Sequence, residues 1–273
     1  MGERPRTYKT EGIILRRRNL GEADSIFTVF AEREGKFDAI AKGVRKARSR
    51  MRGHLEPLTR TRMMLARGRS LDVFTQAETV NPYRGLRENL ERSASAIYCA
   101  ELVDRFAAEH QELPGLYELI LEVFDALEAG APEQVVRYFE QHLLAQMGYE
   151  VQLDACAVCG TRLAEEEALL SASAGGLVDY GCRVVAGSGR VVSVRAIKVL
   201  RYARGASIEA FAGIRIDREL AHELQAALAD LVRYVLDREV NSGRFVAQVT
   251  ALESRHAPER ESAYNEEPNP ATS

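Results

Sequence analysis

The amino-acid sequence predicts an α+β protein of several domains, in which a small N-terminal β-barrel precedes a helical domain that a cysteine-containing module interrupts. Three observations predict it. Residues 8–80 contain short runs rich in β-branched and aromatic residues, apolar residues recur at helical spacing from residue 82 onward, and a segment with three cysteines breaks that spacing between residues 151 and 192. With 273 residues, 46% of them hydrophobic, the chain can bury more than one core.

Five short runs in the N-terminal part are expected to form strands, because β-branched and aromatic side chains suit a pleated surface. In chain order they read GIILRRR, ADSIFTVFAE, KFDAIAKGV, LTRTRMMLA and LDVFTQAETV. Five strands without a helical period favour a nucleic-acid-binding barrel of the OB-fold type, and we assign residues 1–80 to it. The strands carry Phe27, Phe30, Phe37 and Phe74, and alternation alone does not say which of these rings face water.

Helical spacing begins at residues 81 and 82, where Asn81 is expected to cap a helix and Pro82 to occupy its first turn. The apolar stripe of this helix, expected in the core, comprises Leu86, Leu90, Ala94, Ile97, Leu102 and Phe106. Further helices are expected over residues 114–129, 132–147, 194–202 and 217–240, the last capped by Asp217. We therefore expect a helical domain made of residues 81–152 and 193–253, an inserted module of residues 153–192, and a disordered polar tail of residues 254–273.

The inserted module contains two pairs of candidate metal ligands. Cys156 and Cys159 stand at C-x-x-C spacing in CAVCG, and DYGC places Asp179 and Cys182 at the same two-residue gap. A tight turn brings two such ligands to one metal, and Gly160 follows the first pair where the chain must bend. The pattern keeps the spacing of a four-cysteine ribbon with one ligand exchanged, and a carboxylate oxygen also binds zinc. We predict one structural zinc ion held by these four residues.

Other interpretations of the cysteines stay open. The module could be a metal-free relic of a zinc ribbon that hydrophobic contacts hold together. A redox role is disfavoured because no thioredoxin-like pattern surrounds the pair, and a catalytic zinc is disfavoured because none of the five histidines lies near it in the sequence. Cys99 stands alone in an expected helix and is interpreted as a buried thiol.

The net charge of −3 conceals a strong asymmetry. Residues 1–80 contain 18 Lys/Arg and 10 Asp/Glu, a net +8, whereas the remainder contains 19 and 30, a net −11. Such a basic N-terminal part suggests a polyanionic partner, with a solvated basic surface as the alternative. The candidate DNA-binding residues form two clusters, Arg16, Arg17 and Arg18 in the first, and Lys42, Arg45, Lys46, Arg48, Arg50 and Arg52 in the second.

The second cluster, KGVRKARSRMR, has six cations in eleven residues and no acid. If it is extended, Arg48, Arg50 and Arg52 would project on one face at intervals of about 6.5–7 Å. That spacing is close to twice the ~3.4 Å axial repeat of phosphates along one strand of a duplex. Contacts of this kind give affinity for nucleic acid without sequence preference.

Several classes of protein have no support in the sequence. No apolar run approaches the roughly 20 residues that span a bilayer, and the first residues lack the apolar core of a secretory signal. We therefore expect a cytoplasmic protein without a membrane partner, whose thiols stay reduced. The phosphate loop and the H-E-x-x-H and G-x-S-x-G motifs are absent, so we expect no enzymatic activity.

In this combination and order, three stretches resemble the RecO family of bacterial DNA repair and recombination mediators. They are TEGIILRRRNLGEADSIFTVFAEREGK, AKGVRKARSRMRGHLEPL and the CAVCG…AGGLVDYGC block, and the likeness extends over about residues 7–250. The resemblance implies an N-terminal OB-fold and a helical domain with an inserted zinc module. Four cysteines bind the metal in family members with a full zinc module, and Asp179 stands where one of them would be.

The resemblance also implies a function. Members bind single- and double-stranded DNA and anneal complementary strands. With RecR, and in many cases the tail of single-stranded DNA-binding protein, they help load RecA onto coated strands in the RecFOR pathway, at the nucleoid. Two other classes stay open: a protein adaptor whose basic barrel binds acidic partner segments, and a metal-dependent nuclease.

Overall fold

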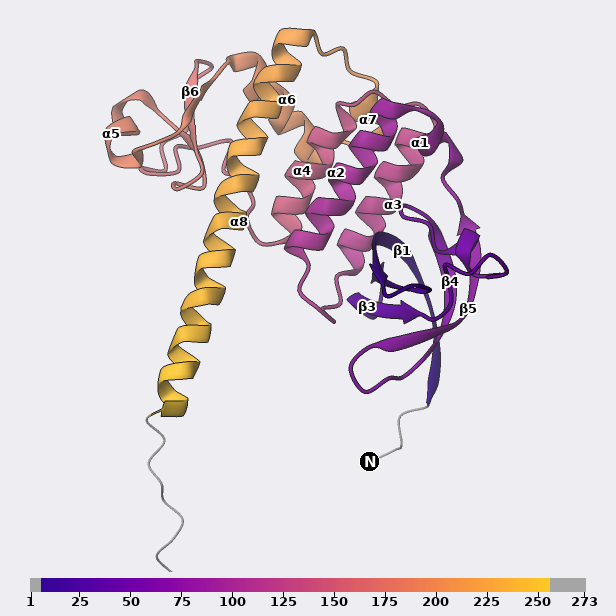
Figure 1. Cartoon of the computed structure of the whole chain (residues 1–273). Helices are drawn as coiled ribbons and strands as arrows, with labels where there is room; N and C mark the ends of the chain where they lie inside the picture. The colour runs from indigo at the N-terminus through magenta and orange to yellow at the C-terminus, as the bar shows by residue number, and fades with distance from the viewer. Residues whose placement is uncertain (1–5, 256–273) are drawn as a thin grey trace, which may run out of the picture. The chain divides into compact units, whose positions relative to one another are not determined.

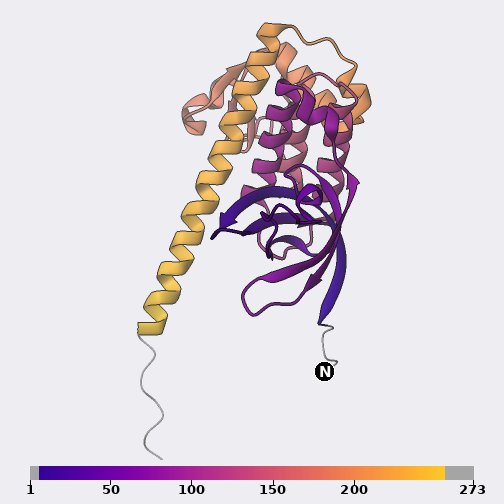
Figure 2. The same cartoon turned by 45° about the vertical axis from the view of Figure 1, so that its right-hand side comes forward.

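The structure is a computed structural model that describes residues 6–255. The chain divides into two compact units between Tyr234 and Val235, a position within the last helix. The first unit holds every element that positions the candidate sites, namely the barrel, a set of helices and a small sheet-containing module (Figures 1 and 2). In the described part of the chain, no helix has the length and apolar character needed to cross a bilayer.

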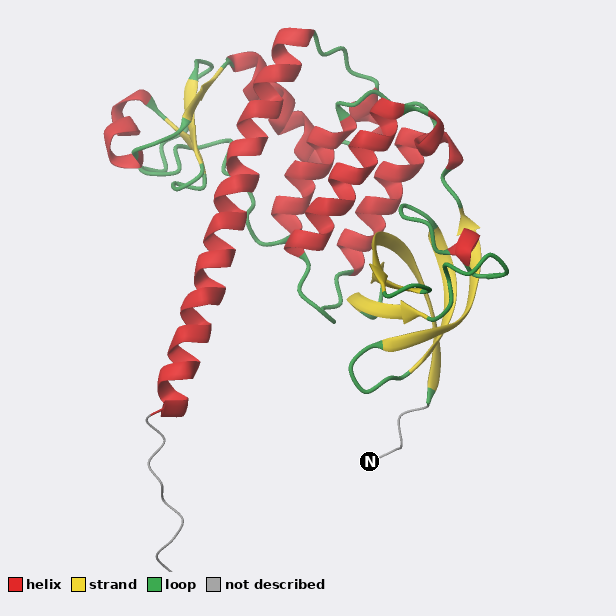
Figure 3. Cartoon of the chain, viewed as in Figure 1, coloured by secondary structure: helices red, strands yellow, loops and turns green. Residues whose placement is uncertain are grey.

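The N-terminal part is a closed five-stranded barrel, which confirms the OB-like prediction (Figure 3). Its strands follow one another around the barrel in the order β1-β2-β3-β5-β4, and all neighbours are antiparallel except β3 and β5. The strand bounds are β1 Thr7–Leu20, β2 Asp24–Ala31, β3 Gly35–Ala41, β4 Arg60–Ala66 and β5 Asp72–Asn81. Each of the five predicted runs therefore forms one strand.

The phenylalanines of these strands are all buried. Phe27, Phe37 and Phe74 belong to the core of the barrel, where the rings of Phe27 and Phe74 meet edge to face with centroids 5.7 Å apart. Phe30 packs instead against Tyr117 of helix α3 (Pro114–Glu128), with centroids 6.0 Å apart. None of these four rings is available to a ligand on the barrel surface.

The helical region follows the barrel. Besides α3 it contains α1 Arg84–Glu88, α2 Leu90–Phe106, α4 Val135–Gln146, α6 Val194–Gly205, α7 Ile208–Ala212 and α8 Arg218–Arg255. As predicted, the Asp217 side chain accepts the Leu220 amide at the start of α8. Lys36 and Arg16 of the barrel both pair with Asp104 of α2, at 3.4 and 3.3 Å, which joins the barrel to the helices.

The predicted start of the first helix is wrong. Asn81 ends β5, and its side chain accepts the Tyr83 amide, so it closes a turn instead of capping a helix. Helix α1 begins only after Tyr83, and it ends before Asn89, whose side chain accepts the Arg92 amide and caps the separate helix α2. The single helical stripe of the sequence is therefore divided between two helices.

This break exposes half of the expected core stripe. Leu90 is 86% and Ile97 55% exposed, and Ala94 between them is also exposed. Helix α2 buries a neighbouring face that includes Cys99, as predicted for that thiol, together with the expected Leu102.

The module lies between α4 and α6 in the sequence. Its strands β6 Ala168–Ser171, β7 Gly176–Val178 and β8 Arg190–Val192 form a sheet of order β7-β6-β8, and the turn η2 Tyr180–Cys182 leads into the short helix α5 Arg183–Ala186. Three ion pairs join the module to α6: Glu165 lies 2.9 Å from Lys198, and Asp154 lies 2.8 Å from Arg204 and 3.5 Å from Arg201. The expected tail of residues 254–273 falls outside the described residues except for its first two, which belong to α8.

One carboxyl group is buried among the helices. Glu140 of α4 is fully buried, accepts a 2.6 Å hydrogen bond from the Tyr98 hydroxyl and lies 3.0 Å from an Arg137 nitrogen. Burial disfavours its ionised form and raises its pKa from 4.5 to about 7, although Arg137 acts in the opposite direction. The folded protein therefore keeps a proton on Glu140 at pH values where the unfolded chain has released it.

We expect the parent protein to lose stability as the pH rises from about 4.5 to about 7, because Glu140 is ionised in the unfolded chain but not in the folded one. Glu140→Gln should lack this part of the pH dependence. Because the folded pKa is raised, that component of stability is complete below pH 4.5 and falls away by about 3 kcal/mol across this window. Urea unfolding of both proteins at several pH values measures it. Glu118→Gln, at an exposed position of α3, is the control and should follow the parent profile. Parallel profiles for the parent and Glu140→Gln would contradict the expectation.

Candidate metal centre and DNA-binding surface

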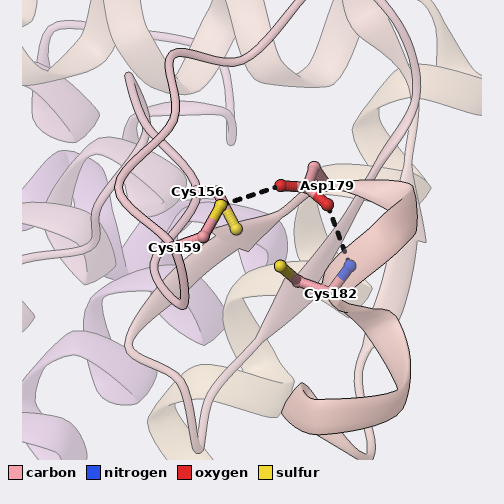
Figure 4. A group of neighbouring side chains, drawn as sticks. All are labelled: Cys156, Cys159, Asp179 and Cys182. Atoms are coloured by element: carbon pink, nitrogen blue, oxygen red, sulfur yellow. Dashed lines mark hydrogen bonds between the residues drawn. The ribbon is translucent and has the colours of Figure 1, made fainter.

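The structure brings together the four residues that the sequence singles out in the module. One ligand atom each from Cys156, Cys159, Asp179 and Cys182 lies within 4.8 Å of the other three (Figure 4). The first two residues come from the loop before β6, and the last two from the turn after β7. Residues twenty positions apart in the chain therefore meet because the β6–β7 hairpin returns the chain to the first loop.

Backbone hydrogen bonds build both turns. The Gly160 amide donates to the Cys156 carbonyl at 2.8 Å, and Gly160 has a φ of 76°, which favours glycine. On the other side, an Asp179 oxygen accepts the Cys182 amide at 2.9 Å and caps the turn η2. The second oxygen of Asp179 accepts a hydrogen bond from the Cys159 thiol at 3.2 Å (Figure 4). Asp179 thus holds its own turn and also faces the opposite one.

These contacts change the acidity of the cluster. The hydrogen bond from Cys159 is the main cause that lowers the pKa of Asp179, whereas hydrogen bonding to Cys159 raises the pKa of Cys182 to about 12. Burial opposes ionisation of the Cys156 thiol, but hydrogen bonds from the backbone of Cys159, Asp179 and Val158 outweigh it and lower the pKa of Cys156. Cys156 and Asp179, one from each turn, are therefore the members of the cluster whose negatively charged forms are favoured.

The donor set fits a four-coordinate metal ion. Ligands at zinc–sulfur distances of about 2.3 Å stand ~3.8 Å from one another in a tetrahedron, and atoms within 4.8 Å of one another approach that size. Cys156 is buried while Cys159 is exposed, so an ion has a solvated path to the cluster. Three thiol sulfurs and one carboxylate supply four ligands, the number that closes a structural site.

The basic segment between β3 and β4 is not extended, so the expected row of guanidinium groups at strand spacing is wrong. Gly43 has a φ of 65°, and the amides of Lys46 and Ser49 donate to the carbonyls of Gly43 and Lys46 in successive turns. The segment then enters the short 3-10 helix Arg52–His54. These turns arise because Val44, within the segment, is buried in the core of the barrel. We call residues 42–58 the basic loop.

The six cations of the basic loop are all exposed. Among the side chains that the structure describes, none of them has a carboxylate in ion-pair distance, and Arg45 donates to the Gly21 carbonyl at 2.9 Å. They are Lys42, Arg45, Lys46, Arg48, Arg50 and Arg52. Their charge is therefore available to an external anion.

The first predicted cluster differs, because each of its arginines has an acidic neighbour. Arg16 pairs with Asp104 at 3.3 Å, and Arg17 lies 3.8 Å from Glu56 and over the ring of Phe27. Arg18 pairs with Asp38 of β3. Their charges are partly neutralised within the molecule.

Two exposed arginines that the sequence reasoning missed lie between β4 and β5. Arg67 covers the ring of Tyr8, 4.7 Å from its centroid, and Arg69 follows it in the same turn. The sequence ARGRS places a cation on each side of a glycine directly after a predicted strand, and this pattern could have indicated an exposed basic turn.

Comparison with known proteins gives a consistent result. The family models "Recombination protein O N terminal" and "Recombination protein O C terminal" match residues 5–83 and 87–244. The chain is 36% identical over 237 residues to the DNA repair protein RecO of Dehalococcoides mccartyi strain CBDB1, covering 86% of this chain and 93% of that one. It is 37% identical over 250 residues to the RecO protein of Roseiflexus sp. strain RS-1, covering 91% and 88% of the two chains.

The OB-like barrel with its unpaired basic loop, the helical region and the cysteine cluster thus define a DNA repair and recombination protein. Both halves of the sequence match one family over nearly the whole described chain. The chain belongs to the RecO family.

We expect Asp179→Asn to weaken divalent-metal binding while leaving the module folded. Asparagine keeps an oxygen that can accept the Cys182 amide, but it removes the negative charge that faces the metal. Asp179→Ala should lose both functions, and Asp179→Cys should hold the metal more tightly than the parent. Competition with a colorimetric chelator and thermal unfolding, on the same preparations, separate affinity from folding. Equal metal affinity in the parent and Asp179→Asn would show that the carboxylate is not a ligand.

Proposed function

We propose that this protein is a non-enzymatic mediator that binds single- and double-stranded DNA, anneals complementary strands and, with RecR, helps load RecA onto strands coated by single-stranded DNA-binding protein. The observation that carries the proposal is the basic loop, with six exposed cations and no acidic partner among the described residues. Its place on an OB-like barrel in a chain of the RecO family supports nucleic acid as the anion.

The loop would act through the phosphate backbone. Lysine and arginine that contact phosphates release condensed counterions, which supplies affinity without reading bases. Annealing requires two polyanions to approach each other, and a cationic surface reduces their repulsion. We assign this role to Lys42, Arg45, Lys46, Arg48, Arg50 and Arg52, and a secondary role to Arg16, Arg17 and Arg18, whose acidic neighbours compete with phosphate.

We further propose that the metal is one zinc ion held by Cys156, Cys159, Asp179 and Cys182. When bound, zinc would supply a structural cross-link between the two turns and no catalytic chemistry. The chain's own contribution is the cap made by Asp179 and the small apolar core of Cys156, Leu169 and Val178, which orient the ligands.

The remaining parts of the proposal concern organisation and place. We take residues 1–80 as the DNA-binding domain, 81–152 and 193–253 as the helical domain and 153–192 as the zinc module. We place the protein in the cytoplasm, at the nucleoid during repair. An adaptor role for the same loop, with an acidic protein segment as the anion, is distinguished by the first of two experiments.

Reversing the charge of Arg48, Arg50 and Arg52 to Glu should weaken binding to all DNA sequences alike, by about tenfold or more at 0.15 M salt. The slope of log affinity against log salt should fall by up to about 2–3, because up to three phosphate contacts are lost. Fluorescence anisotropy with labelled single strands and duplexes at several salt concentrations gives both quantities.

The control reverses three exposed arginines that already have acidic partners, Arg105, Arg195 and Arg233. It changes the net charge by the same amount but should retain most of the affinity. Unchanged DNA binding in the Arg48/Arg50/Arg52 variant, with reduced binding to an acidic partner peptide, would favour the adaptor.

The purified protein should also accelerate annealing of complementary strands, both bare and coated by single-stranded DNA-binding protein. The acceleration should decline as salt rises, since the same phosphate contacts bring the strands together. One strand carries a fluorophore and its complement a quencher, so the decrease in fluorescence measures the rate of annealing. Absence of acceleration at every salt concentration would refute the proposal, and shortening of the labelled strands in the presence of divalent ions would indicate a nuclease.

A further inference from the structure

A protein that prefers unpaired strands usually offers an aromatic ring on which a base can stack. The barrel does not supply one from its strand phenylalanines, because Phe27, Phe30, Phe37 and Phe74 are all buried. Among the described residues, the most exposed aromatic side chain is Tyr180, which is 77% exposed and lies in the module, between Asp179 and Cys182.

The position of Tyr180 is fixed by its neighbours in the chain. Asp179 accepts the Cys182 amide at 2.9 Å and so caps the turn that carries Tyr180, and the two ligands beside it face the opposite turn of the cluster (Figure 4). The backbone below the ring is therefore held on both sides, although the ring itself lies in solvent. A held backbone reduces the entropy lost when a ligand stacks on the ring.

A cation stands beside this ring. The guanidinium carbon of Arg183 lies over Tyr180, 4.9 Å from the centroid of the ring. In the part of the chain that the structure describes, Arg183 has no carboxylate in ion-pair distance, and its Nε has no hydrogen-bond acceptor. An aromatic ring with a solvent-exposed face and an adjacent unpaired guanidinium is complementary to a base and its phosphate.

We infer that Tyr180 and Arg183 form a stacking site for an unpaired nucleotide, with the base on the open face of Tyr180 and the phosphate near Arg183. The inference rests on the proposed DNA binding and adds a contact that a single strand can make and a duplex cannot. In a duplex the bases are stacked on one another and cannot reach the ring, so this site favours single strands, whereas the basic loop binds the phosphates of both forms.

The experiment compares Tyr180→Leu with Tyr180→Phe in the full-length, metal-loaded protein. Each is titrated with an oligothymidine strand, a strand of abasic residues of the same length, and a duplex. Stacking contributes about 1–3 kcal/mol per base, so Tyr180→Leu should bind oligothymidine at least about fivefold more weakly, whereas Tyr180→Phe keeps the ring and should match the parent. Binding of the abasic strand and the duplex should be the same in all three proteins.

Val184→Ala serves as the matched control, because Val184 is 93% exposed in helix α5, directly after the turn that carries Tyr180, but is not aromatic. Metal content and thermal unfolding confirm that each variant retains the module. If Tyr180→Leu binds oligothymidine as tightly as the parent does, the inference is overturned. An equal loss on all three ligands also overturns it, as does a loss confined to binding of a partner protein, which would make this surface a protein-docking site.

The result is separable from the test of the basic loop. If the Arg48/Arg50/Arg52 variant loses DNA affinity and Tyr180→Leu does not, the stacking site fails and the proposed function stands. If the parent protein binds no DNA, the proposed function itself fails.

Discussion

Burial of two apolar side chains determines the course of the basic loop, and the proposed function depends on it. Val44 and Leu55 stand near the two ends of the loop, and both belong to the core of the barrel. Fully burying such side chains contributes about 1.5–3 kcal/mol each, whereas exposed like charges in water repel one another by roughly 1 kcal/mol or less per pair. The two anchors therefore offset the repulsion among the cations, and the one acid of the loop, Glu56, lies 3.8 Å from Arg17 of β1 and pairs with none of the six cations.

Asp179 shows how a carboxylate can stand within a cluster of cysteines without disturbing the fold of the module. A cysteine at this position would supply sulfur to the metal but would be a poor acceptor for the Cys182 amide. The carboxylate has two oxygens, and it directs one to that amide and the other to the opposite turn. The exchange thus adds a cap to the turn while retaining a negatively charged donor. With a metal bound, such a module would depend less on it for local structure than one whose four ligands are all thiolates.

Local sequence patterns predicted the features that depend on local chemistry. The five strands and the meeting of Cys156, Cys159, Asp179 and Cys182 follow from short-range composition and from spacing. Other features depend on contacts between distant residues, and the sequence did not predict them. No residue near Arg16 in the sequence predicts its ion pair with Asp104. The burial of Val44, which bends the basic loop, depends on the closed barrel. The break before α2 was missed because Leu90 and Ile97 continue a helical period although Asn89 caps a new helix.

The ion pairs of α6 have a consequence for how a polyanion would approach. Its cations are matched with acids of the module and with the residue that caps α8: Arg195 with Asp217, Lys198 with Glu165, and both Arg201 and Arg204 with Asp154. Paired charges of opposite sign cancel one another's field within about a Debye length, roughly 8 Å at physiological ionic strength. Helix α6 therefore contributes little to the long-range electrostatic field, although it is rich in lysine and arginine. The long-range attraction of a polyanion would come instead from cations without an acidic partner, such as those of the basic loop and Arg183.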